Sequence, residues 1–146
     1  SLPTPALYLN ELAHLFAQLA TGVLRQEQTP DPFLDRIYQA MTTHPELVAG
    51  SNRFDTVMMK ETYPYLGCKV GGEAIRGFAL RPQSGEFFGL AVKVEDGAMR
   101  ALHPACIALL QQLTFLPEKL SKPLQDLFEG RESNWAGRQA TRFRIG

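Results

Sequence analysis

The feature that most constrains the fold is a set of three short runs rich in aromatic and β-branched residues, at 63–71, 74–80 and 87–94. Gly71-Gly72 separates the first two runs, and a Pro-Gln-Ser-Gly segment at 82–85 separates the last two. Both connections have turn compositions. Because parallel strands need a longer crossover, these connections predict an antiparallel three-stranded meander. The sheet could gain strands from a further segment, and would then have an uncovered edge here.

Apolar residues recur at helical spacing on both sides of these runs. The pattern predicts helices from residue 9 to a cap at Gly22, from Asp31 to about His44, over 53–60, over about 99–113 and over about 120–128. Residues 143–145 could add an edge strand. Helices therefore precede and follow an antiparallel sheet that they can cover, which predicts an α+β fold in one unit spanning residues 1–146.

Composition excludes several classes of function. The chain has 15 Lys and Arg residues and 15 Asp and Glu residues. It therefore lacks the excess of basic residues that would indicate a nucleic-acid-binding protein. No apolar run approaches the roughly 18 residues needed to cross a membrane. The two cysteines, Cys68 and Cys106, make a poor disulfide framework and a poorer metal site, so we expect reduced thiols in a cytoplasmic protein.

The segment from Lys69 to Glu73 offers the strongest candidate chemistry. Glycines at 71 and 72 let a ligand approach the backbone, where an exposed N–H can hold a developing oxyanion. A lysine in a partly buried site can carry a proton for a nearby hydroxyl nucleophile. Residue types alone leave a second interpretation open, in which Lys69 is a surface residue before a hairpin turn.

Three acidic or basic residues are further candidates. Arg53 and Asp55 form a structural ion pair in one interpretation and line a pocket in the other. Glu73 either binds the α-ammonium group of an amino-acid substrate or is a solvated turn residue. Cys68, beside Lys69, is either a reactive thiol or an inert buried cysteine.

Four separated motifs in one order resemble the second half of the rhizobial-type L-asparaginases, also called asparaginase II. The motifs are HPELVAG at 44–50, NRFDT at 52–56 with Met58-Met59, KVGGE at 69–73, and GLAVKVEDG at 89–97 with Arg100-Ala101. The resemblance covers residues 2 to about 113. It implies a fold related to the serine β-lactamases and glutaminases, of which this chain would form the carboxyl-terminal half.

The resemblance implies a serine nucleophile, assisted by lysine, that hydrolyses the side-chain amide of L-asparagine to aspartate and ammonia. Lys69-Val70-Gly71 matches the Lys-Thr-Gly triplet of β-lactamase-like sites, with Val70 in place of the hydroxyl residue. That departure weakens any inference to β-lactam chemistry. Lys69 would then be catalytic, and Gly71, Gly72, Glu73, Arg53 and Asp55 would bind substrate.

The nucleophile itself is not in this sequence. None of its five serines is followed three residues later by lysine. The resemblance places that motif, and the cysteines that bind zinc in members of the family, in an amino-terminal half. We therefore expect no cofactor in this chain, the missing half as its partner, and L-asparagine or a related small amide as substrate. A homodimer stays open, and the alternative function is a binding or assembly module without chemistry.

Overall fold

The computed structural model describes residues 5–24 and 29–129, and this part of the chain holds one three-stranded sheet. The strands are β1 (Leu66–Gly71), β2 (Ile75–Leu80) and β3 (Phe88–Lys93). They lie in the order β1-β2-β3, each antiparallel to its neighbour. The predicted meander is confirmed, although the strands are shorter than the predicted runs.

The sheet has two different faces because successive side chains of a strand alternate. Cys68, Phe78 and Leu90 stand opposite one another in the three strands and face the main hydrophobic core. The next positions along the strands, Lys69, Gly77 and Ala91, also stand opposite one another and belong to the other face. Lys69 is therefore on the face that does not carry the main core.

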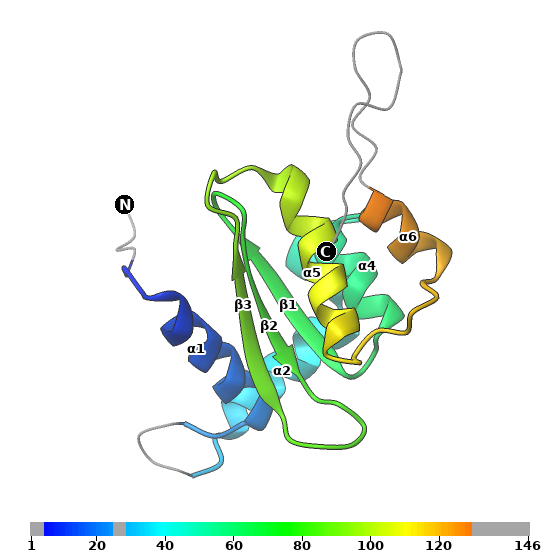
Figure 1. The fold of residues 1–146 in the computed structure, drawn as a ribbon. Coiled ribbons are helices and arrows are strands. Elements are labelled where there is room, and N and C mark those ends of the chain that lie inside the picture. The colour runs from blue at the N-terminus through cyan, green and yellow to red at the C-terminus, as the bar shows by residue number, and fades with distance from the viewer. Residues whose placement is uncertain (1–4, 25–28, 130–146) are drawn as a thin grey trace, which may run out of the picture.

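Helix α1 (Leu9–Thr21) covers part of this second face (Figure 1). Two glycines of the sheet permit its close approach. A Cβ added at Gly77 would lie 1.9 Å from the ring of Phe16, and one added at Gly89 would lie 2.0 Å from the carbonyl oxygen of Ala13. The backbone of α1 thus packs directly on β3, and an aromatic ring of α1 fills the space above β2.

Five further helices complete the described fold. They are α2 (Pro32–Thr43), α3 (Pro45–Ala49), α4 (Phe54–Glu61), α5 (Met99–Gln112) and α6 (Lys122–Glu129). The helices expected from periodicity are all present, and two predicted caps are confirmed. Gly22 ends α1 with φ 71°, and Asp31 accepts a hydrogen bond from the Phe33 N–H at 2.8 Å.

The structure corrects the sequence interpretation at two helices. The sequence predicts that Pro45 ends the preceding helix near His44, but Pro45 also begins the short α3, which the sequence analysis does not predict. Helical spacing predicts that the apolar face of α5 consists of Met99, Leu102, Ala105, Cys106, Leu109, Leu110 and Leu113. This prediction is partly wrong. Ala105 is exposed, whereas Ile107 and Ala108 are buried, because α5 packs against both the sheet and α6.

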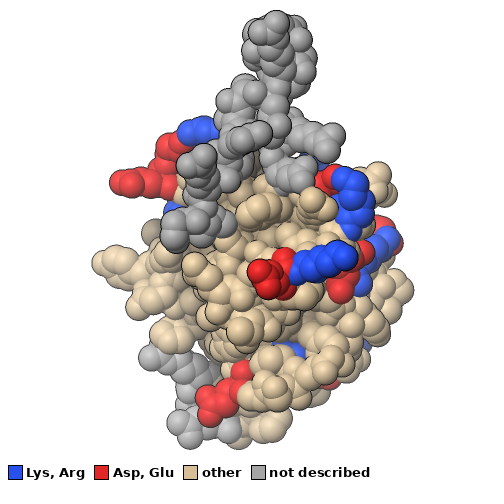
Figure 2. All heavy atoms as spheres, turned by 45° about the vertical axis from the view of Figure 1, so that its right-hand side comes forward, with Lys and Arg blue, Asp and Glu red and all other residues tan. Residues whose placement is uncertain are grey.

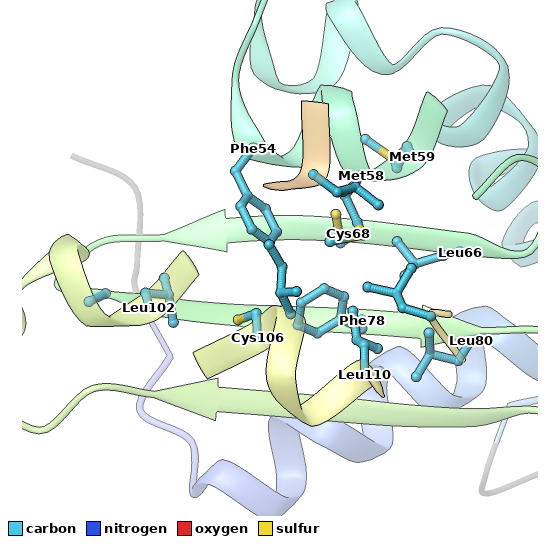
Figure 3. Packing of buried hydrophobic residues seen from close by; sticks show 14 residues of the cluster. Phe54, Met58, Met59, Leu66, Cys68, Phe78, Leu80, Leu102, Cys106 and Leu110 are labelled. Atoms are coloured by element: carbon cyan, nitrogen blue, oxygen red, sulfur yellow. The ribbon is translucent and has the colours of Figure 1, made fainter. Parts of the chain in front are cut away.

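The main core lies between the first face of the sheet and helices α4, α5 and α6 (Figures 1 and 3). Figure 3 shows Phe54 and Met58 of α4 above Cys68 of β1 and Phe78 of β2, with Cys106 of α5 beside them. The predicted α+β class, with helices covering the sheet, is confirmed. No helix in the described ranges is long and apolar enough to cross a membrane. The edge strand suggested at 143–145 lies outside the described residues.

Candidate active site

Lys69 lies near the end of β1 with an exposed side chain. Its Nζ donates a hydrogen bond to the carbonyl oxygen of Val70 at 2.9 Å. Val70 packs against the main core, so Lys69, its neighbour in the strand, belongs to the opposite face. The side chain predicted to be catalytic is therefore accessible to a group that approaches this face of the sheet.

The turn between β1 and β2 has an unusual backbone. Glu73 and Ala74 have φ values of 54° and 53°, in the left-handed region that non-glycine residues rarely adopt. Beside Gly72 the space is open, since an added Cβ would meet no atom within 4 Å. Strained backbone of this kind concentrates at ligand sites, and the open side of Gly72 leaves room for a ligand.

Lys93, at the end of β3, holds this turn in place. Its Nζ donates hydrogen bonds to the carbonyl oxygens of Glu73 at 2.7 Å and Val94 at 2.6 Å. The Val94 N–H in turn donates to the carbonyl oxygen of Ala74 at 2.9 Å. Sequence reasoning did not single out Lys93. The predicted meander could have indicated Lys93, because an antiparallel meander places the end of its third strand beside its first turn.

The Glu73 side chain is exposed, and its carboxylate forms no ion pair with any residue that the structure describes. Gly71, the last residue of β1, is exposed as well. Lys69, Gly71, Gly72 and Glu73 are thus all exposed at the end of β1, with the half-buried Val70 between Lys69 and Gly71. The structure brings these four predicted residues together because they follow one another around the end of a strand.

Asp55 and Arg53 behave differently from the prediction. Asp55 lies near the start of α4, with its side chain 1% exposed, and pairs with Arg76 of β2, Oδ1 to Nε, at 2.8 Å. Arg53 is exposed and forms no ion pair with Asp55, so that interpretation was wrong. The reason is local: Arg53 precedes the helix on its solvent side, whereas Asp55 faces the sheet.

Arg76 is the residue of this region that sequence reasoning missed. Its guanidinium lies 3.8 Å from the centre of the Phe54 ring, and its Nη1 lies 3.8 Å from the Cys106 Sγ. The ring of His103 stacks on Phe54 at 4.7 Å. A signal was available, because Arg76 stands two residues before Phe78 in β2 and therefore points to the same, core-facing side, where an arginine requires a buried carboxylate as partner.

The two thiols of this region are not activated. Burial raises the pKa of Cys68 well above its usual value, and burial also raises the pKa of Cys106 to about 11. Both cysteines are free and buried. A thiol in this state is a poor nucleophile, because the thiolate is the reactive form. The structure thus favours the inert interpretation of Cys68.

In the described ranges, no three His, Cys, Asp or Glu side chains lie close enough together to hold a metal ion. Figure 2 shows acidic and basic side chains lying next to one another on the face that it presents.

A pocket of about 900 Å³ lies elsewhere, between the residues before β1, the loop after β2 and the segment that joins α5 to α6. Its lining includes Tyr65, Phe88 and Leu116 but none of the residues 69–73. Tyr65 precedes β1, whereas Lys69 is near its other end. This pocket is thus separate from the Lys69 segment.

The exposed segment combines a cation at Lys69, an open backbone at Gly72 and a carboxylate at Glu73. Together these groups can move a proton, hold an oxyanion and bind an ammonium group, but they supply no nucleophile. Comparison with protein families gives a match to the model of L-asparaginase II over residues 1–145. Comparison with curated proteins gave no match.

Proposed function

Because this chain belongs to the L-asparaginase II family, we propose that it supplies Lys69 and the turn at Gly72 to a site that hydrolyses L-asparagine. The observation that carries the proposal is the exposed Lys69 beside an open, strained turn, in a chain that matches this family along its length. The products would be aspartate and ammonia.

The reaction requires a hydroxyl nucleophile from a part of the protein outside these residues. Its oxygen would attack the side-chain carbonyl carbon of L-asparagine while Lys69 carries the hydroxyl proton toward the leaving nitrogen. The backbone N–H at Gly72 would stabilise the oxyanion. Ammonia would leave, and water would then cleave the resulting ester to release aspartate.

Glu73 would bind the α-ammonium group of the substrate. Its exposure and its lack of an ion-pair partner among the described residues support this role. The free, reduced state of both cysteines fits a reducing compartment, so the proposal places the enzyme in the cytoplasm.

The test uses the complete gene product and measures ammonia released from L-asparagine. The Lys69→Ala variant is expected to lose about 10²–10⁴-fold in kcat, which is the range contributed by a positioned proton carrier. Lys122→Ala is the matched control, since Lys122 is an exposed lysine on α6. A Lys69→Ala enzyme with full activity would exclude the role of Lys69.

A second candidate is a binding or assembly module on the same scaffold, favoured by the absence of any serine with lysine three residues later in this sequence. Calorimetry separates the two, because a module would bind L-asparagine or the partner half without releasing ammonia. A small panel of amides that includes L-glutamine would show whether a relative of asparagine is the preferred substrate.

A further inference from the structure

Val70 follows Lys69 in β1, which is an edge strand of the sheet in the described part of the chain. The N–H of Val70 has no strand beside it to pair with. Instead it donates to Oδ2 of Asp55, in α4, at 2.7 Å. A side chain from a helix thus takes the place of a neighbouring strand at this one position.

The same carboxylate also reaches the next strand. Its Oδ1 accepts a hydrogen bond from Arg76 Nε at 2.8 Å, and both side chains are 1% exposed. Arg76 is the residue of β2 that stands directly opposite Val70. The Asp55 carboxylate therefore joins two cross-strand neighbours. It accepts from the backbone N–H of Val70 and from the side chain of Arg76.

Arg76 is itself fixed in place. Phe54 lies against its guanidinium at 3.8 Å, and Cys106 of α5 accepts from it at 3.8 Å. A buried carboxylate without a cationic partner would be strongly disfavoured, and Arg76 supplies that partner and fixes the position of the Asp55 side chain. The network thus ties the end of β1 to α4, β2 and α5.

We propose that Asp55 is a positioning residue, which acts on Lys69 and the turn at Gly72 by holding the Val70 N–H between them. The inference rests on the proposed function of Lys69 and replaces direct substrate contact by Asp55, which is buried. Loss of this one hydrogen bond frees the strand end at the residue next to Lys69. A displacement of about 1 Å at a reacting group can lower a rate by about 100-fold.

The experiment compares two double variants of the complete gene product. Asp55→Asn with Arg76→Met removes both charges but keeps an oxygen that can accept from Val70. Asp55→Leu with Arg76→Met removes both charges and that oxygen, with a side chain of similar shape. The two proteins differ at residue 55 alone, where the asparagine offers the Val70 N–H an acceptor and the leucine does not.

The measurements are kcat and KM for L-asparagine, melting temperature, and residue-resolved hydrogen exchange at Val70. The leucine variant is expected to show a kcat about 10–100-fold below that of the asparagine variant, with KM changed less than about threefold and Val70 exchanging faster. Equal kcat values in the two variants would overturn the inference. A much raised KM in both would overturn it too, because it indicates direct binding.

The unaltered protein supplies a check that does not depend on the variants folding. Its Val70 amide is expected to exchange slowly although β1 is an edge strand, and rapid exchange would overturn the inference. Ammonia release by the same protein tests the proposed function separately. Slow exchange at Val70 without any ammonia release would reject the proposed function, and with it the catalytic role of the hydrogen bond between Val70 and Asp55. The structural role of that hydrogen bond would stand.

Discussion

The buried charged side chains of the described residues form one pair. Asp55 and Arg76 are each about 1% exposed and satisfy one another, while the other ion pairs of the described chain have exposed members. Removing one member of a buried pair leaves the other charged in an apolar surrounding, which costs far more than the loss of a surface pair. The two kinds of pair should therefore respond very differently to substitution.

Substitution of Arg76 by Met is expected to lower the free energy of unfolding by about 3–5 kcal/mol, because Asp55 is left buried without its cation. Urea denaturation of the complete protein measures the change. Lys60→Met is the matched control, since Lys60 pairs with Glu46 at the surface and should cost less than about 1 kcal/mol. Equal losses of unfolding free energy in the two variants would show that the Asp55–Arg76 pair is more accessible to water than in this structure.

His103 predicts a dependence of stability on pH. Burial, with the nearby guanidinium of Arg76, lowers the pKa of His103 to about 4, below the value of about 6.5 that it has in an unfolded chain. The unfolded state therefore binds a proton first as the pH falls, so stability is lost between about pH 6.5 and 4. A His103→Gln variant is expected to lose less stability over this range in urea denaturation. An imidazole titration midpoint near 6.5 by NMR would contradict the argument.

At the scale of the elements, the contact between α1 and the sheet depends on missing side chains. The atoms nearest to an added Cβ at Gly89 are backbone atoms of α1, whereas those at Gly77 belong to the Phe16 ring. A ring can turn or shift, but a helix backbone can move away only as a whole. Gly89 should therefore tolerate a methyl group less well than Gly77.

Substitution of Gly89 by Ala is expected to destabilise the protein by about 1–3 kcal/mol or more, because α1 must lift from β3. Thermal unfolding of the complete protein measures the effect. Gly72→Ala serves as control, since a methyl group there meets no atom within 4 Å, and should change stability by less than about 0.5 kcal/mol. A Gly89→Ala protein as stable as the control would show that the backbone of α1 does not pack directly on β3.

Local patterns predicted most of the elements, because they depend on short-range signals. Alternation with turn residues indicated the meander, and the caps at Gly22 and Asp31 indicated helix ends. The partner of Asp55 could not be found in this way, since Arg76 is brought to it only by the packing of α4 on the sheet. The exposed segment 69–73 was predictable because its members are adjacent in sequence.

At the scale of the whole molecule, the described residues divide into a packed body and one accessible strand end. The buried network beneath β1 supports Lys69 from one side, and the opposite side is open at Gly72. The two thiols of the described residues are buried with raised pKa values, so neither is an activated nucleophile. Under the proposed function, Lys69 and the turn at Gly72 would assist a reaction whose nucleophile lies outside these residues.

We therefore expect the 146-residue chain alone to release no ammonia from L-asparagine, even where circular dichroism shows that it is folded. The complete gene product should do so, and the chain mixed with the separately expressed remainder should recover part of that activity. The reason is chemical: proton transfer and oxyanion stabilisation lower the barrier only when a nucleophile is held within reach of the carbonyl carbon. Turnover by the isolated chain would contradict this division, because it would require a nucleophile among residues 1–146.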